Sequence, residues 1–152
     1  LEVIVERFYP TEYIRVTKEP VLPYLKSVGL WKTYSSINWI KNLILNYLTP
    51  GMEKTAARNH PSWQKENAPM FLWGVVMGGH MDEARVKRLL PAMKERAEKK
   101  GRNLEILFHP GTVLPDELGE EFCNHSANGF YVSAGRHVEY EAVMSLTDED
   151  LK

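Results

Sequence analysis

The sequence predicts an α/β fold with parallel strands, and three consecutive segments support this. Residues 70–76 are almost entirely apolar, as in a strand that is covered on both faces of a parallel sheet. Residues 82–100 carry apolar side chains at helical spacing, and residues 103–108 form a second apolar run. A strand, a helix and a strand in this order predict a right-handed parallel βαβ unit.

Length and composition limit the possible classes of protein. The chain has 152 residues, 43% of them hydrophobic, which suits one core, so we take residues 1–152 as one domain or part of one. The 19 basic and 20 acidic residues give no electrostatic reason to expect nucleic acid or a membrane as partner. The longest apolar run, residues 70–77, is far shorter than the roughly twenty residues of a membrane span. The single cysteine, Cys123, cannot form an internal disulfide, which favours a cytoplasmic protein.

The first residues predict a helix and then a strand. Leu1, Ile4, Val5 and Phe8 follow the spacing of one helix face, but no capping residue precedes them. This pattern indicates a helix entered midway and a chain cut from a longer one. Residues 13–16 are rich in β-formers and predict a short strand, with Arg15 near its exit.

Further helices are expected on each side of the βαβ unit. Between residues 33 and 48, apolar residues recur every three or four positions, and Pro50-Gly51 predicts the end of that helix, with a weaker helix over residues 52–58. In the helix over residues 82–100, Asp82 is the expected N-cap. Its expected inner positions are Val86, Leu89, Leu90 and Met93. A final helix over residues 133–146 should turn Val138, Ala142, Val143 and Leu146 inward.

Basic residues gather near the end of the helix over residues 82–100. Lys99, Lys100 and Arg102 match the negative end of the helix dipole. We therefore expect this cluster to be solvated.

The carboxyl ends of three predicted strands, here called strand exits, should lie at one edge of the sheet, here called the rim. Parallel α/β proteins bind their ligands at this edge. The first exit carries Arg15, the second carries Gly78-Gly79-His80 and Asp82, and the third carries His109-Pro110-Gly111. This shared placement is the main functional signal in the sequence.

His109 is the sharpest catalytic candidate. Imidazole transfers protons near neutral pH, and a Pro-Gly turn would hold it at a rigid strand end. The alternative is a loop histidine that bonds a neighbouring carbonyl. For His80, Gly79 permits close approach of a ligand and Asp82 could orient the ring, but Asp82 as a helix cap beside an exposed His80 explains the same residues.

Other polar residues also have two interpretations. Arg15 could bind a carboxylate or an oxyanion, or form a surface ion pair with Glu19. Arg136 and Glu139, three residues apart, suit a structural salt link. Cys123 with His125 would suit a thiolate nucleophile if a third group oriented them.

Several segments together resemble the YdjC-like carbohydrate deacetylases. They are Tyr-Ile-Arg-Val-Thr-Lys-Glu-Pro at 13–20, Gly-Val-Val-Met-Gly-Gly-His-Met at 74–81, Leu-Glu-Ile-Leu-Phe-His-Pro-Gly at 104–111, and Phe-Tyr-Val-Ser at 130–133 followed by Arg136 and Glu139. The resemblance implies part of a deacetylase-like (β/α) barrel, related to the polysaccharide deacetylases, that lacks its N-terminal half. It also implies removal of N-acetyl groups from small amino sugars such as chitooligosaccharides.

The resemblance implies a divalent metal, Mg or Zn, in the parent enzyme. Family members hold it with an acidic strand end and a His-x-His pair, which would precede Arg15, so this chain alone should bind none. By the same analogy, His109 protonates the departing amine and Arg15 lies near the substrate. Gly79 and His80 are expected to contact the substrate.

Three functions therefore remain open. The first is the C-terminal portion of a carbohydrate N-deacetylase that is inactive alone, and the second is a non-catalytic carbohydrate-binding or regulatory module. The third is an unrelated enzyme that uses Cys123. A cut barrel would expose strand edges, so self-association through the sheet edge is also expected.

Overall fold

The computed structural model describes residues 17–59, 70–112, 115–117, 119, 129 and 132–151. Two parallel strands, β1 (Met70–Trp73) and β2 (Asn103–Ile106), pair in register from Met70↔Asn103 to Trp73↔Ile106. Helix α5 (Glu83–Glu98) connects them, so the predicted parallel βαβ unit is confirmed. The fold is α/β and mostly helical, and these two strands are the sheet that the described residues form.

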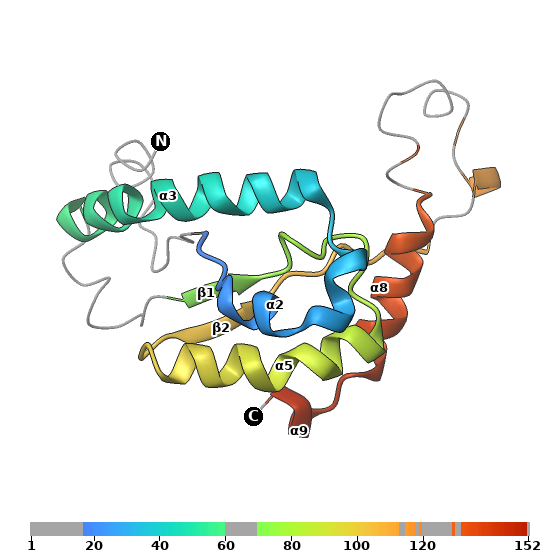
Figure 1. Ribbon diagram of the computed structural model, residues 1–152. Coiled ribbons are helices and arrows are strands. Elements are labelled where there is room, and N and C mark those ends of the chain that lie inside the picture. The colour runs from blue at the N-terminus through green and yellow to red at the C-terminus, as the bar shows by residue number, and fades with distance from the viewer. Residues whose placement is uncertain are drawn as a thin grey trace.

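Helices surround the two strands. In Figure 1, α3 and α5 flank the strands, and α8 stands at the end toward which both strands run. The remaining elements are α2 (Leu22–Lys26), the 3-10 helix η1 (Val28–Thr33), α3 (Ser36–Asn59), the 3-10 helix η2 (Pro115–Glu117), α8 (Ala134–Ser145) and α9 (Asp148–Leu151).

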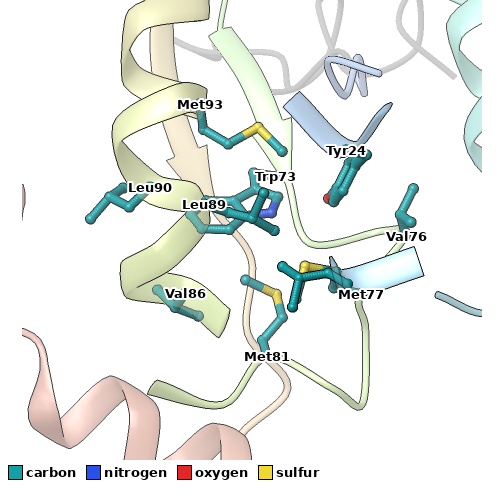
Figure 2. Close-up of a cluster of buried hydrophobic side chains, with 10 residues drawn as sticks. Tyr24, Trp73, Val76, Met77, Met81, Val86, Leu89, Leu90 and Met93 are labelled. Carbon is teal, nitrogen blue, oxygen red and sulfur yellow. The ribbon is translucent and has the colours of Figure 1, made fainter. Parts of the chain in front are cut away.

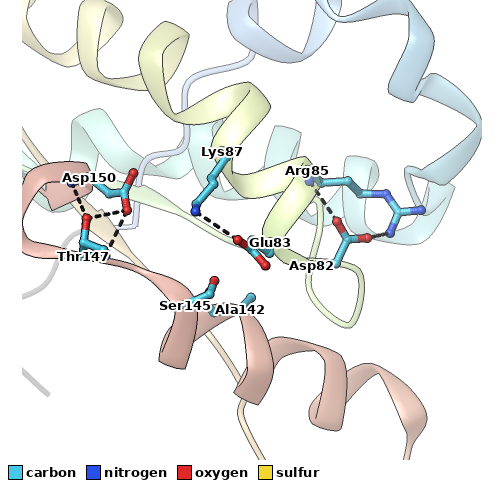
Figure 3. A network of polar contacts seen from close by, with 8 residues as sticks. All are labelled: Asp82, Glu83, Arg85, Lys87, Ala142, Ser145, Thr147 and Asp150. Carbon is cyan, nitrogen blue, oxygen red and sulfur yellow. Dashed lines mark hydrogen bonds and ion pairs between the residues drawn. The ribbon is translucent and has the colours of Figure 1, made fainter.

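Local sequence signals explain helix α5. The Asp82 carboxylate accepts a hydrogen bond of 2.8 Å from the Arg85 backbone amide, which confirms the predicted N-cap. The Arg85 side chain also pairs with Asp82, and Lys87 lies 2.9 Å from Glu83 one turn along (Figure 3). The start of α5 is therefore fixed by its own residues.

The main hydrophobic core lies between α5, β1 and α2. The predicted inner positions of α5 are all buried, and they pack with side chains from β1 and the loop after it (Figure 2). Trp73 is fully buried at the centre, with the ring of Tyr24 from α2 in the same cluster. The cluster comprises Tyr24, Leu30, Trp73, Val76, Met77, Met81, Val86, Leu89, Leu90 and Met93.

The chain from residue 17 to residue 19 runs alongside β1. The Leu72 backbone amide donates to the Lys18 carbonyl at 2.9 Å, and the Glu19 carboxylate reaches the amides of residues 74–76. Lys18 thus contacts β1 through its backbone, and the Glu19 side chain contacts the loop that follows β1. The strand predicted over residues 13–16, Arg15 and the first helix lie outside the described residues.

Helix α3 corrects the prediction that a helix ends at Pro50-Gly51. It continues to Asn59 although Pro50 lacks the amide for one helical hydrogen bond, a cost of about 3 kcal/mol. The half after Pro50 is held by the rest of the protein, since Arg102 lies 2.7 Å from Glu53 and Ala56 is fully buried. Tertiary contacts therefore offset the proline.

The apolar face of α3 lies at the surface. Six large side chains on it are half or more exposed, namely Ile37, Ile40, Leu43, Ile44, Tyr47 and Leu48. The buried positions Asn42, Thr49 and Ala56 recur every seven residues on the other face. That face is polar because it meets backbone: the Thr49 hydroxyl lies 2.6 Å from the Thr17 carbonyl oxygen.

Three other expectations are corrected. Strand β2 is half-buried rather than covered on both faces. In α8 the buried residues are Glu139 and Ala142, whereas Val143 is exposed. Arg102 is not a solvated end charge, because it pairs with Glu53 and lies 5.1 Å from the centre of the Phe71 ring.

Candidate functional site

The exits of the described strands meet around one open cavity of about 370 Å³. Its walls come from the first turns of α3, the loop after β1, the segment after β2, and the start of α8. The lining residues are Asn38, Lys41, Gly74, Val75, Gly78, Gly79, Leu107, His109, Ser133 and Arg136. We call this the rim cavity, and it lies where the sequence predicted a site.

A buried carboxylate, Glu19, shapes the β1 side of the rim. It is 2% exposed and accepts from the amides of Gly74, Val75 and Val76 at 2.7, 3.1 and 3.0 Å. The Tyr24 hydroxyl and the Asn42 amide each donate to it at 2.6 Å. Five donors on one side chain fix the loop after β1 against α2 and α3. Glu19 is therefore a buried residue and not the surface residue that the sequence suggested.

Burial sets the protonation of this pair. It raises the pKa of Glu19 above the usual 4.5, although the donated hydrogen bonds act in the opposite direction. Burial and the neighbouring Glu19 carboxylate raise the pKa of Tyr24 well above 10.0. The Tyr24 phenol therefore stays protonated and donates a hydrogen bond to the Glu19 carboxylate.

A second buried carboxylate, Glu139 of α8, links the segments that follow β1 and β2. It is fully buried, and its Oε1 and Oε2 atoms accept from the backbone amides of Gly79 and His109, both at 2.5 Å. The sequence predicted a salt link between Glu139 and Arg136; the contacts that the structure gives Glu139 include these two backbone amides. The Glu139 side chain thus fixes the loop after β1 and the segment after β2 relative to each other.

Helix α8 also holds the His-Pro-Gly turn through backbone contacts. The Arg136 guanidinium donates to the Pro110 carbonyl at 3.0 Å, and the Gly111 amide donates to the Arg136 carbonyl at 3.1 Å. A Cβ at Gly135 would overlap the carbonyl oxygen of Gly79, so glycine lets α8 approach the loop after β1. The turn that carries His109 is therefore rigidly placed.

The predicted site residues separate into three groups. His109 and Gly79 line the rim cavity, and the His109 side chain is 40% exposed. His80 is exposed and does not belong to the lining, which fits the alternative in which Asp82 caps the helix beside it. Arg15 and Cys123 lie outside the described residues, as do His60 and His125.

Four polar residues of the lining were not predicted from the sequence to bind a ligand. They are Asn38, Lys41, Ser133 and Arg136. Lys41, Arg136 and His109 are cationic or become so on protonation, and among the described residues no carboxylate side chain joins them in the lining. Such walls suit a ligand rich in oxygen acceptors. The available signal was the spacing of Asn38 and Lys41, three residues apart in the first turns of the predicted helix.

Metal binding has no basis in the part of the chain that the structure describes. There, no three His, Cys, Asp or Glu side chains come close enough to hold a metal ion. The described residues therefore supply no ligand set for the metal that the family resemblance implies.

A larger groove of about 670 Å³ lies beside β2, between α5 and α8. Its floor is apolar, with Leu104, Ile106 and Phe108, and it contains none of the predicted site residues. The rim cavity is smaller, but its histidine and its convergent polar groups make it the better candidate.

Comparison with protein-family models, with curated proteins and with solved structures finds no match to this chain. Across the described ranges, no helix combines the length and the apolar character needed to cross a bilayer.

Proposed function

We propose that this chain is the C-terminal portion of a deacetylase-like (β/α) barrel whose parent enzyme removes N-acetyl groups from small amino sugars such as chitooligosaccharides. The observation that supports this is the position of His109, at the end of a parallel strand and in the wall of a cavity with several hydrogen-bond donors. Sugar hydroxyls and an acetamide oxygen are acceptors of the kind such walls bind.

His109 supplies the proton in this proposal. An amine is a poor leaving group, so a positioned acid must protonate its nitrogen as the C–N bond breaks. Imidazole suits this role near neutral pH. Lys41 of α3 and Arg136 of α8 both line the rim cavity, and in this proposal they bind acceptor oxygens of the sugar and orient it.

A divalent metal, Mg or Zn, belongs to the proposed parent enzyme and not to the described residues of this chain. We therefore assign no step to it here. The proposal predicts that the 152-residue chain alone does not deacetylate its sugar, even with added metal, although it binds the sugar.

The proposal is tested by titrating the chain with N,N′-diacetylchitobiose in a calorimeter and assaying for released acetate. We expect saturable binding without acetate release. Changing His109 to alanine should weaken binding by about fivefold, as expected for one lost hydrogen bond. The control is His137→Ala, since His137 lies on the exposed face of α8. Absence of binding, or equal binding by both variants, would contradict the proposal.

A second candidate is a non-catalytic carbohydrate-binding or regulatory module. It would use the same donor-lined rim cavity to bind sugar hydroxyls. Both candidates bind sugar, so the full-length parent protein separates them: acetate release by that protein indicates the enzyme, and binding without release indicates the module.

The proposal extends to self-association and location. Within the described residues, β2 pairs with β1 on one side, and no strand covers its other edge. We propose that this edge pairs with a second copy of the chain, which predicts a sedimentation coefficient that rises with protein concentration. A monomer at all concentrations would contradict it.

The proposed location is the cytoplasm, on the ground of the single cysteine.

A further inference from the structure

We propose that a second site, separate from the rim cavity, binds a small organic phosphate that carries an apolar or aromatic group. The site is an open pocket of about 720 Å³ between α2, the end of α5 and the start of β1, here called the basic pocket. Among the described residues it shares no lining residue with the rim cavity, and it lies at the opposite end of the strands (Figure 1). The proposal therefore does not depend on sugar binding.

Four basic side chains from three parts of the chain line the basic pocket. They are Lys18, Arg96, Lys100 and Arg102. Lys18 lies before α2, Arg96 lies in the last turn of α5, and the other two lie in the connection from α5 to β2. Like charges repel one another, so an anion bound between these side chains would relieve the repulsion.

Acidic residues offset little of this positive charge. Glu53 lies 2.7 Å from Nη1 of Arg102, but the other three cations form no ion pair with a described residue. The described lining includes the Glu19 carboxylate, which is 2% exposed and whose two oxygens accept hydrogen bonds from the loop after β1. Three of the four positive charges are therefore uncompensated within the described residues, which favours a ligand with more than one negative charge.

Arg102 is held in place before any ligand arrives. Its side chain is 15% exposed, its Nη1 atom donates to Glu53, and its guanidinium carbon lies 5.1 Å from the centre of the Phe71 ring. The contact with Glu53 uses one nitrogen of a group with five N–H donors, so Arg102 can also bind phosphate oxygens. A fixed guanidinium loses little freedom when the ligand binds, which favours affinity.

The part of the lining that α2 contributes is apolar. Leu22 and Leu25 line the basic pocket and are 42% and 50% exposed. Inorganic phosphate would leave these side chains in water, whereas an organic phosphate would cover them. The combination of cations and exposed leucines therefore matches a phosphate ester of an apolar or aromatic alcohol.

The test is a titration of the ¹⁵N-labelled full chain with phenyl phosphate, which is largely a dianion near pH 8. We expect saturable shifts of the backbone amides of Arg96, Lys100 and Arg102. Phenyl sulfate has the same shape and one negative charge less, so it should bind about fivefold more weakly, the effect of one charge in water.

Substitutions locate the bound phosphate. Arg96→Gln and Lys100→Gln should each weaken the binding of phenyl phosphate by about tenfold, as for one lost hydrogen bond to a charged group. Lys100 is exposed, so its variant keeps the fold. The matched control is Lys99→Gln, which removes the same charge from a residue that pairs with Glu95 and does not line the basic pocket. Its affinity should change by less than about twofold in physiological salt.

Three outcomes would overturn the proposal. They are the absence of saturable binding of phenyl phosphate, equal affinities of Lys100→Gln and Lys99→Gln, and amide shifts confined to the rim cavity. Binding of vesicles that contain phosphatidic acid, by a chain that does not bind the soluble ester, would also overturn it, because that result would identify a membrane surface as the partner.

Discussion

Replacing Glu19 with alanine is expected to lower the free energy of unfolding by about 3–5 kcal/mol, the range seen when one partner of a buried charged network is removed. The change leaves donors of the loop after β1, of Tyr24 and of Asn42 without their acceptor in a buried place. Urea unfolding followed by circular dichroism measures the loss.

The matched control is Glu98→Ala in α5. Glu98 is exposed and lies in a helix, where alanine is well tolerated, so the stability should change by less than about 0.5 kcal/mol. Equal, small effects of both substitutions would show that Glu19 does not hold the rim together.

The pH dependence of a second variant, Glu19→Gln, has a definite sign. Burial raises the pKa of Glu19 in the folded state, so its stabilising contribution is full below the usual value of 4.5 and is lost as the pH rises through the folded value. Glutamine does not titrate. The variant should therefore be more destabilised, relative to wild type, near pH 4 than near pH 7, and the reverse order would contradict the raised pKa.

Gly74→Ala is the second substitution with a large expected effect, a loss of about 3 kcal/mol or more. Gly74 has φ = +141°, which side chains rarely adopt, and a Cβ there would overlap the carbonyl oxygen of Leu107 in the neighbouring strand exit. The two exits that frame the rim cavity would have to separate. Thermal unfolding and the loss of sugar binding both report this change.

Gly51→Ala is its control. Gly51 lies within α3, and a Cβ there meets nothing within 4 Å. Alanine should therefore stabilise the protein by about 0.5–1 kcal/mol, because it favours the helix and restricts the unfolded chain. A stable Gly74→Ala variant would show that the close approach of the two exits is not required.

The parts of the fold that follow from neighbouring residues were predictable. The βαβ unit, the inner face of α5 and the Asp82 cap each depend on patterns within a few residues, and the structure confirms all three. The position of His109 at the rim follows from the rule that parallel strands end on the same side of a sheet.

The remaining features depend on partners that are distant in the sequence. Glu19 and Glu139 are ordinary surface residue types, and they are buried here because backbone amides 55 and 60 residues away satisfy their oxygens. Helix α3 continues past Pro50 because Arg102 holds its second half through Glu53. The spacing of Asn42, Asn46 and Thr49 was the local sign that its polar face turns inward.

The central claim is that the rim cavity binds an N-acetylated amino sugar. It is tested most directly by following the backbone amide signals of the ¹⁵N-labelled chain during titration with N,N′-diacetylchitobiose and with its fully deacetylated counterpart. We predict that the acetylated sugar shifts the amides of Gly78, Gly79 and His109 most, and that the deacetylated sugar shifts them less. Signals that move only in the groove beside β2, or that do not move at all, would contradict it.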